Sequence, residues 1–187
     1  MTQDQELWNS YNNLLLSSDT DRIKKLLARY EVFKKAMKVP GDIVECGVFK
    51  GISLTRFLTF REILENNDYR KIYGFDVFGK FPKPKNQGDK SFLKRWEKNA
   101  GDGIDAQELN NILLEKKFSN FELVKGDVKK TIPNLIKQQP HLKISLLHLD
   151  MDIYESTKFV LNKLFSYVVK GGIILIDDYN SVFGATK

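Results

Sequence analysis

The stretch that decides the fold is IVECGVFKGISLTRFLTFREILENNDYRKIYGFDVF, residues 43–78. Its first part, residues 43–49, is a short run rich in apolar and β-branched residues, as expected of a strand. Residues 53–67 then show the apolar spacing of an amphipathic helix and end in an asparagine pair. Residues 71–78 return to the strand pattern. The stretch therefore predicts a strand, a helix and a second strand in succession.

The same alternation continues to the end of the chain. It predicts further strands at residues 120–128, 144–151 and 171–179, with helices at 129–139 and 155–169. Strands that are apolar on both faces and separated by helices indicate an α/β protein with a doubly wound, mainly parallel sheet and helices on both faces. In such folds ligands bind beyond the carboxyl ends of the strands, near the point where strand order reverses.

A length of 187 residues suits one domain with a full core, so we expect residues 1–187 to form a single domain. Residues 1–40 read as a helical N-terminal extension with a cap at Asp19 or Thr20. Its expected buried face carries Ile23, Leu26, Leu27, Tyr30, Phe33 and Met37. Residues 78–119 interrupt the alternation and suggest a lid or substrate-binding insertion. A surface excursion with its own helix, in residues 105–117, is the alternative.

Composition narrows the class of protein. A single cysteine, the lack of a leader and the lack of any long apolar run predict a cytoplasmic protein without a membrane segment. The formal charge is +6, and residues 80–98 hold seven basic and two acidic side chains. A lysine-rich solvated surface explains this better than nucleic-acid binding. An anionic small substrate would suit the basic segment as well as RNA would.

Two glycines follow the first predicted strand, in VECGVFKGIS (residues 44–53). Gly47 and Gly51 let the backbone turn tightly and approach a ligand before a helix begins near Ser53. The GxGxxG pattern of dinucleotide-binding loops is absent. A mononucleotide-type loop and a plain strand-to-helix turn are therefore equally consistent with this stretch.

Two aspartates lie at the ends of the second and third predicted strands. Asp76, late in the second predicted strand, is placed to accept hydrogen bonds from the ribose hydroxyls of an adenosine ligand, or else to serve a turn. Asp127, after the third, could reach an adenine amino group or cap the next helix. Cys46, in the first predicted strand, is expected to be a buried apolar residue, and His148, in the fourth, a packed core histidine.

Four more aspartates end the last two strands, in LDMDIYEST (149–157) and GGIILIDDY (171–179). If these strands are neighbours, Asp150, Asp177 and Asp178 bring several carboxylates into a small volume. Such a group repels itself unless a cation is bound, and oxygen ligands suit Mg²⁺, Mn²⁺ or Ca²⁺. The alternative, in which Asp152 caps a helix and Asp177-Asp178 form a turn, accounts for fewer of the four.

The stretches GDIVECGVFKGIS, YGFDVFGKFP, HLDMDIYEST and GGIILIDDY resemble, in order and spacing, the macrocin O-methyltransferase (TylF-like) family of antibiotic biosynthesis. The resemblance runs from about Asp21 to the end, and LDxDxYxST followed by GGxxxxDDY is its most specific part. It implies a class I, Rossmann-like methyltransferase that uses S-adenosylmethionine and Mg²⁺ to methylate a hydroxyl of a sugar or glycosylated small molecule.

The resemblance also implies roles for individual residues. Asp152 would be the general base, and the magnesium ligands would be Asp150, Asp177 and Asp178. The expected cofactor-binding residues are Glu45, Gly47, Gly51, Ser53, Asp76, Asp127 and Asp150.

The chain also departs from the family pattern. Members continue past DDY with a helix and two strands, so we expect the C-terminal strands to be missing and the open sheet edge to favour a homodimer. Phe49-Lys50 and His148 replace an expected Trp-Arg and Arg. The alternative functions are an NAD(P)-dependent Rossmann oxidoreductase and a non-catalytic, RNA-binding domain that uses residues 80–98.

Overall fold

The computed structural model of the chain describes residues 2–17, 20–80, 90, 98 and 100–179. Its centre is one sheet of five parallel strands in the order β3-β2-β1-β4-β5. Their bounds are β1 (Asp42–Cys46), β2 (Ile72–Asp76), β3 (Phe121–Lys125), β4 (Ile144–Leu149) and β5 (Val168–Ile176). β4 is buried along its whole length, including its two polar residues, Ser145 and His148.

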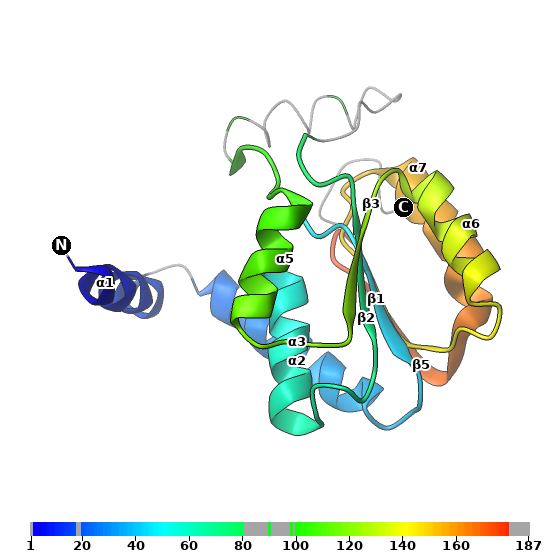
Figure 1. Cartoon of the computed structure of the whole chain (residues 1–187), viewed down its shortest axis with the longest axis horizontal. Coiled ribbons are helices and arrows are strands. Elements are labelled where there is room, and N and C mark those ends of the chain that lie inside the picture. The colour runs from blue at the N-terminus through cyan, green and yellow to red at the C-terminus, as the bar shows by residue number, and fades with distance from the viewer. Residues whose placement is uncertain (1, 18–19, 81–89, 91–97, 99, 180–187) are drawn as a thin grey trace.

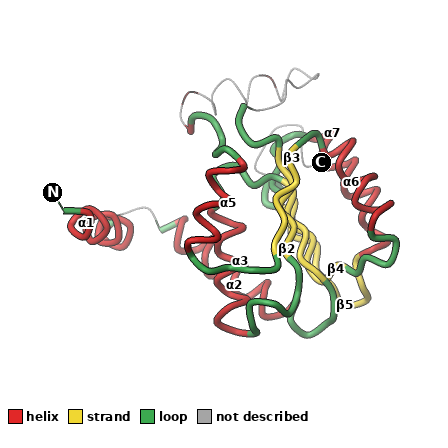
Figure 2. Tube along the Cα trace, in the orientation of Figure 1, coloured by secondary structure: helices red, strands yellow, loops and turns green. Residues whose placement is uncertain are grey.

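Helices cover both faces of the sheet (Figures 1 and 2). One face carries α2 (Asp21–Ala36), α3 (Ile52–Leu64) and α5 (Ala106–Glu115), and the other carries α6 (Val128–Gln138) and α7 (Tyr154–Leu164). Each layer has its own apolar core, one around Phe33, Phe57 and Leu146 and one around Val44, Ile132 and Leu147. The predicted doubly wound α/β fold is confirmed.

Strand order reverses between β1 and β4, which lie side by side at the middle of the sheet. From β1 the chain moves outward through β2 to β3, and it then returns to place β4 and β5 on the other side. The loops that leave β1 and β4 therefore diverge toward opposite faces at the carboxyl edge. The predicted site residues follow these strands, so they meet at this edge.

Several boundaries differ from those predicted. α7 ends at Leu164 and is followed by a 3₁₀ turn, η1 (Phe165–Tyr167), before β5 begins at Val168 rather than at residue 171. The β-branched pair Val168-Val169, assigned to the helix from sequence, belongs to the strand, as its intrinsic preference favours. β1 stops at Cys46 rather than at residue 49, because Gly47 (φ 94°) turns the chain out of the sheet.

The N-terminal extension forms two helices, α1 (Gln3–Leu16) and α2. The face predicted for α2 was wrong at one position: Leu27 is 58% exposed, whereas Arg29 is only 5% exposed. The helix is rotated so that this arginine points toward the carboxyl edge of the sheet. No helix among the described residues is long and apolar enough to cross a membrane.

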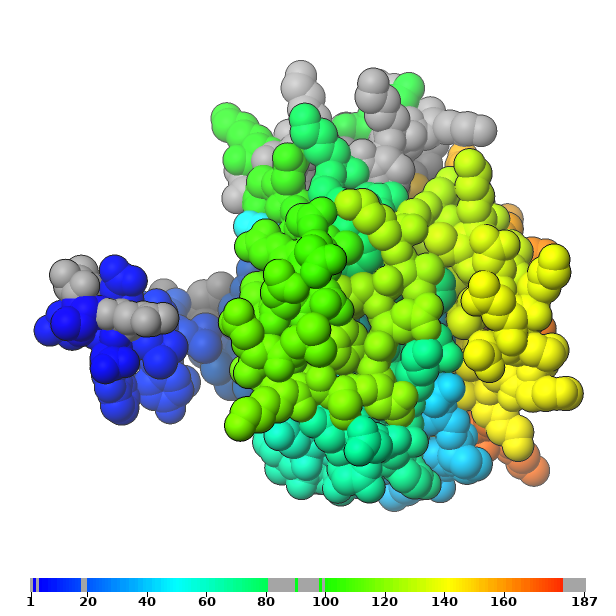
Figure 3. Space-filling model, viewed as in Figure 1, coloured from blue at the N-terminus to red at the C-terminus, as the bar shows by residue number. Residues whose placement is uncertain are grey.

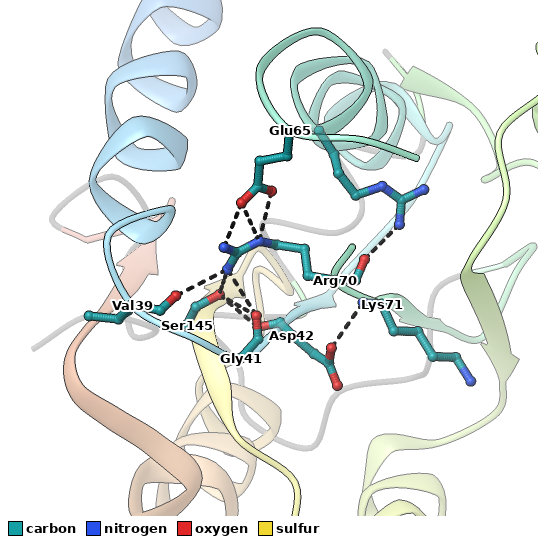
Figure 4. A network of polar contacts seen from close by, with 8 residues as sticks. Val39, Gly41, Asp42, Glu65, Arg70, Lys71 and Ser145 are labelled. Atoms are coloured by element: carbon teal, nitrogen blue, oxygen red, sulfur yellow. Dashed lines mark hydrogen bonds and ion pairs between the residues drawn. The ribbon is translucent and has the colours of Figure 1, made fainter. Parts of the chain in front are cut away.

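The amino edge of the sheet is closed by a buried ion pair. The Arg70 guanidinium donates to both carboxylate oxygens of Glu65 at the end of α3, at 2.7–3.1 Å. It also donates to the Gly41 carbonyl at 2.9 Å and to Ser145 Oγ at 2.6 Å, which ties β1 and β4 to the same group (Figure 4). This edge is therefore a structural support, opposite the acidic edge that follows the strands.

Of the predicted insertion, residues 81–89, 91–97 and 99 lie outside the described residues, and most of the basic segment 80–98 lies there too. The helix expected at residues 105–117 is confirmed as α5, with Asp105 as its side-chain cap. The Ile104 N–H donates to the Phe49 carbonyl at 2.9 Å, and the Gly103 N–H donates to the Gly79 carbonyl at 3.0 Å. The described end of the insertion thus packs against the loop after β1.

Candidate active site

The loop after β1 is shaped by its two glycines. A Cβ at Gly47 would lie 1.8 Å from the Asp150 carbonyl oxygen, so only glycine fits where the loops after β1 and β4 touch. Gly51 (φ 80°) is the N-cap of α3, and a Cβ there would lie 2.5 Å from the Leu109 side chain. Both glycines are thus required by the backbone, and their contact with a cofactor stays a prediction.

Asp76 organises this loop. One of its carboxylate oxygens accepts from the N–H groups of Val48 and Phe49 at 2.7 and 2.8 Å, and the other accepts from the N–H of Phe78 at 2.9 Å. A carboxylate has about four acceptor positions, so three backbone donors leave one for a ligand such as a ribose hydroxyl. Asp76 therefore lies where predicted, and much of its bonding capacity is already used.

The alternative for Asp127 given above, a helix cap, is confirmed. Its side chain accepts from the Lys129 N–H at 2.9 Å at the start of α6. The exposed carboxylate lies beyond the end of β3, and contact with an adenine stays a prediction.

Beneath the loop lies a buried acid–histidine pair. Glu45 and His148 are fully buried on neighbouring strands, with Glu45 Oε2 3.7 Å from His148 Nδ1. His148 Nδ1 is also 3.5 Å from Ser53 Oγ, and its ring packs edge-on against Phe57. His148 is a packed histidine as predicted, and Cys46 is likewise buried, which raises the pKa of its thiol. Glu45 lies under the site, and its contact with a cofactor stays a prediction.

Asp150 and Asp152 occupy the turn between β4 and α7. The Asp150 N–H donates to the Cys46 carbonyl at 2.8 Å, which fixes the turn against β1. Asp152 has a left-handed backbone (φ 57°) that is uncommon outside glycine. It does not cap α7, because Ile153 is the N-cap and makes no side-chain cap bond. Its carboxylate is therefore not occupied in starting the helix.

Among the described residues, two overlapping groups of side chains bring three possible ligand atoms within 4.8 Å of one another. One group is Asp150, Asp152 and Asp178, and the other is His148, Asp150 and Asp177. Asp177 and Asp178 form a turn after β5, as in the alternative given above, and not the end of the strand, and they fall into different groups, with Asp150 common to both. The four aspartates predicted from sequence thus lie at one corner of the sheet.

The electrostatics of the two groups differ. Burial raises the pKa of Asp152 to about 8 and that of Asp150 to about 7, and neighbouring carboxylates add to both shifts. Burial also raises the pKa of Asp178, although the N–H of Asp152, 3.1 Å from its Oδ2, opposes the rise. On balance the surroundings of these three carboxyls favour the neutral form over the charged form, which is the condition that a bound cation relieves.

Asp177 is compensated by helix α2. Burial alone would raise its pKa, but the hydrogen bond from Lys25 and the charges of Arg29 and Lys25 together lower it. Sequence reasoning missed both cations. Their spacing of four residues, within a helix whose neighbours at 26, 30 and 33 face the core, is the signal that could have found them.

A parallel sheet of order 3-2-1-4-5, a glycine loop after its first strand and an acidic carboxyl edge together define a Rossmann-like α/β protein with a candidate site at that edge. The solved structure of the O-methyltransferase NovP matches 87% of this chain and 68% of its own, with a TM-score of 0.70 and 24% identity, which supports the fold. The calicheamicin methyltransferase CalS11 matches 90% of this chain and 69% of its own, with a TM-score of 0.66 and 30% identity.

The chain belongs to the macrocin-O-methyltransferase (TylF) family, whose model matches residues 19–187. Demethyldecarbamoylnovobiocin O-methyltransferase of Streptomyces niveus is 30% identical over 157 residues, and mycinamicin III 3''-O-methyltransferase of Micromonospora griseorubida is 30% identical over 149. Each match covers 75% of this chain, and the chain spans about half the length of these relatives, 53% and 56%. The resemblance inferred from sequence is confirmed.

Proposed function

We propose that the protein is an S-adenosylmethionine-dependent, Mg²⁺-assisted O-methyltransferase that acts on a hydroxyl of a sugar or glycosylated small molecule. The observation that carries the proposal is the gathering of Asp150, Asp152, Asp177 and Asp178 beside the glycine loop, where strand order reverses. Family membership supports the reaction class, since the similar proteins are named as O-methyltransferases.

The residues fit a hard divalent cation. The donors of the four aspartates are carboxylate oxygens, which suit Mg²⁺, and burial together with the neighbouring carboxylates raises the pKa of three of them, Asp150, Asp152 and Asp178. We propose Asp150, Asp177 and Asp178 as the ligands. When bound, the ion would stabilise negative charge that develops on the acceptor hydroxyl oxygen.

Asp152 is proposed as the general base. It belongs to the same group as Asp150 and Asp178, and its side chain takes no part in capping α7. A carboxylate beside the acceptor hydroxyl can accept its proton as the methyl group is transferred. The proton would pass to an Asp152 carboxylate oxygen as the acceptor oxygen takes the methyl group.

The cofactor would lie along the loop from Gly47 to Ser53. Gly47 and Gly51 leave two positions of the loop without a side chain, and the remaining acceptor position of Asp76 is available to a ribose hydroxyl. Asp127, just beyond the carboxyl end of β3, would face the adenine of the cofactor. Glu45 would contribute indirectly. It lies beneath the loop beside His148, whose Nδ1 is 3.5 Å from the Ser53 hydroxyl.

The test starts with calorimetric titration of S-adenosylhomocysteine in Mg²⁺ and in EDTA. Binding in both conditions is expected, because the proposed cofactor contacts of the loop after β1 and of Asp76 do not need the metal. Methyl transfer is then measured on sugar acceptors, including TDP-rhamnose, the sugar named for CalS11. We expect EDTA and Asp150→Asn each to abolish transfer. A chain that binds no S-adenosylhomocysteine in either condition would contradict the proposal.

A further inference from the structure

The cationic face of α2 meets the acidic corner of the sheet. Lys25 and Arg29 are four residues apart, so their side chains lie on the same side of the helix. The Lys25 ammonium donates to Asp177 Oδ2 at 2.7 Å, and Arg29 Nη2 donates to Asp177 Oδ1 at 2.8 Å. Both carboxylate oxygens of this proposed metal ligand are thus already bonded to cations of the chain itself.

The two cations are held very differently. Arg29 is buried, and it also donates through Nε to Ser53 Oγ at 3.0 Å and lies 3.5 Å from Asp150 Oδ2. The Lys25 side chain is 49% exposed, and within the described part of the chain its ion pair is with Asp177. A half-exposed lysine regains solvation when it leaves its carboxylate, whereas a buried guanidinium does not, so Lys25 can leave more easily than Arg29.

A divalent cation and the lysine compete for one place. Asp150 and Asp177 offer ligand atoms within 4.8 Å of one another, so a cation between them would adjoin the Asp177 carboxylate. Arg29 already donates to Asp177 Oδ1 and is held in place by Ser53 and Asp150. This leaves Oδ2 as the oxygen available to an ion. The ammonium that now bonds to Oδ2 would be repelled by the arriving charge.

We infer that Lys25 is a built-in competitor that sets the metal affinity of the site: it neutralises Asp177 Oδ2 until a divalent cation displaces it, while Arg29 keeps the carboxylate in position. This inference rests on the metal site of the proposed function. It assigns to α2, outside the sheet that supplies the aspartates, the control of how tightly the ion binds.

The first test is the dissociation constant of Mn²⁺, measured by electron paramagnetic resonance on the full chain. Lys25→Met keeps the apolar stem and removes the charge, and we expect it to bind Mn²⁺ about fivefold to tenfold more tightly than the wild type. Lys24→Met is the matched control, because Lys24 lies on the same helix and pairs with Asp21 at 3.0 Å. It should leave the constant unchanged within about twofold.

The second test follows the ammonium directly. Acetylation of amines, read residue by residue by mass spectrometry, should modify Lys25 faster once Mn²⁺ saturates the site, while the rate at Lys24 stays the same. Equal Mn²⁺ affinity in the Lys25→Met and Lys24→Met variants, or a Lys25 rate that ignores the metal, would overturn the inference while leaving the metal site intact. Retained S-adenosylhomocysteine binding without Mn²⁺ binding in any form would overturn the inference together with the metal site. Loss of both kinds of binding would overturn the proposed function as a whole.

Discussion

Among single residues, Asp152 has the most demanding position. Its left-handed backbone turns the chain so that its carboxylate joins those of Asp150 and Asp178 instead of capping α7. A residue held in an unusual conformation at a site is often held there for function.

Asp152→Asn tests this role, because the amide keeps the shape of the side chain and cannot accept the proton. We expect kcat for methyl transfer to fall by about 10²-fold or more, with S-adenosylhomocysteine affinity unchanged by calorimetry. Asp21→Asn, at the exposed start of α2, serves as the control and should keep full activity. Activity above a tenth of wild type in Asp152→Asn would remove this aspartate as the base.

The raised pKa values of Asp150 and Asp152 make the stability of the metal-free protein depend on pH. Between the ordinary aspartate value of about 4 and the folded values of about 7 and 8, the native state binds more protons than the unfolded state. The free energy of unfolding therefore falls as pH rises through this window, and Mg²⁺ should restore it at the upper end.

Thermal melts in EDTA from pH 5.5 to 8.5 measure the effect. We expect Tm to fall by roughly 5 °C across the range, and Asp178→Asn to flatten the profile because it removes one of the repelling charges. Comparing the two proteins removes the effect of overall net charge. A Tm that is constant or rises with pH in the wild type, with the same profile in the variant, would show that the carboxyls are compensated in some other way.

At the scale of elements, the corner between β1 and β4 is the tightest contact in the site. The Asp150 carbonyl fills the space over Gly47, and the Asp150 N–H donates to the Cys46 carbonyl. The two diverging loops are thus locked backbone to backbone.

Gly47→Ala should force these loops apart. We expect a loss of about 3 kcal/mol or more in the free energy of unfolding, or no soluble protein, because the new Cβ meets rigid backbone at a positive φ. Gly101→Ala is the matched control: it also has a positive φ (70°), but no atom of the described residues lies within 4 Å of its added Cβ. It should cost about 1 kcal/mol in urea unfolding. Equal losses in the two variants would contradict the close contact.

The helices and strands were largely predictable, because their hydrophobic periodicity can be seen within short stretches of the sequence. The order of residues along β1, β4 and β5 was enough to bring the aspartates to one edge. The start of β5 was missed because Val168-Val169 follow a helix without a glycine or proline to mark the break. The spacing of Lys25 and Arg29 marks a cationic face of α2, but the partners of Arg29, Ser53 and Asp177, are 24 and 148 residues away, so the sequence does not specify what that face contacts.

At the scale of the whole molecule, α1 stands beside the body and contributes little to its core (Figure 3). Trp8 and Leu16 are 64% and 84% exposed, and Leu7, Tyr11, Leu14 and Leu15 are exposed as well. Among the residues that the structure describes, Leu26 is the first whose side chain joins either core cluster.

Removal of residues 1–17 is therefore expected to change Tm by less than about 2 °C and to reduce binding of the dye ANS, which reports exposed apolar surface. Calorimetry and dye fluorescence on the full and shortened chains measure both quantities. A shortened chain that melts well below the full one would show that α1 supports the core.

The two halves of Asp150 act independently. Its backbone amide and carbonyl hold β1 and β4 together, whereas its carboxylate points into the acidic corner and takes no part in that junction. At this position the main chain thus determines how the two strands are joined, and the side chain determines the chemistry of the site. Evolution or protein design could therefore replace the side chain at residue 150 and change the chemistry of the site. The backbone junction that requires glycine at residue 47 would stay the same.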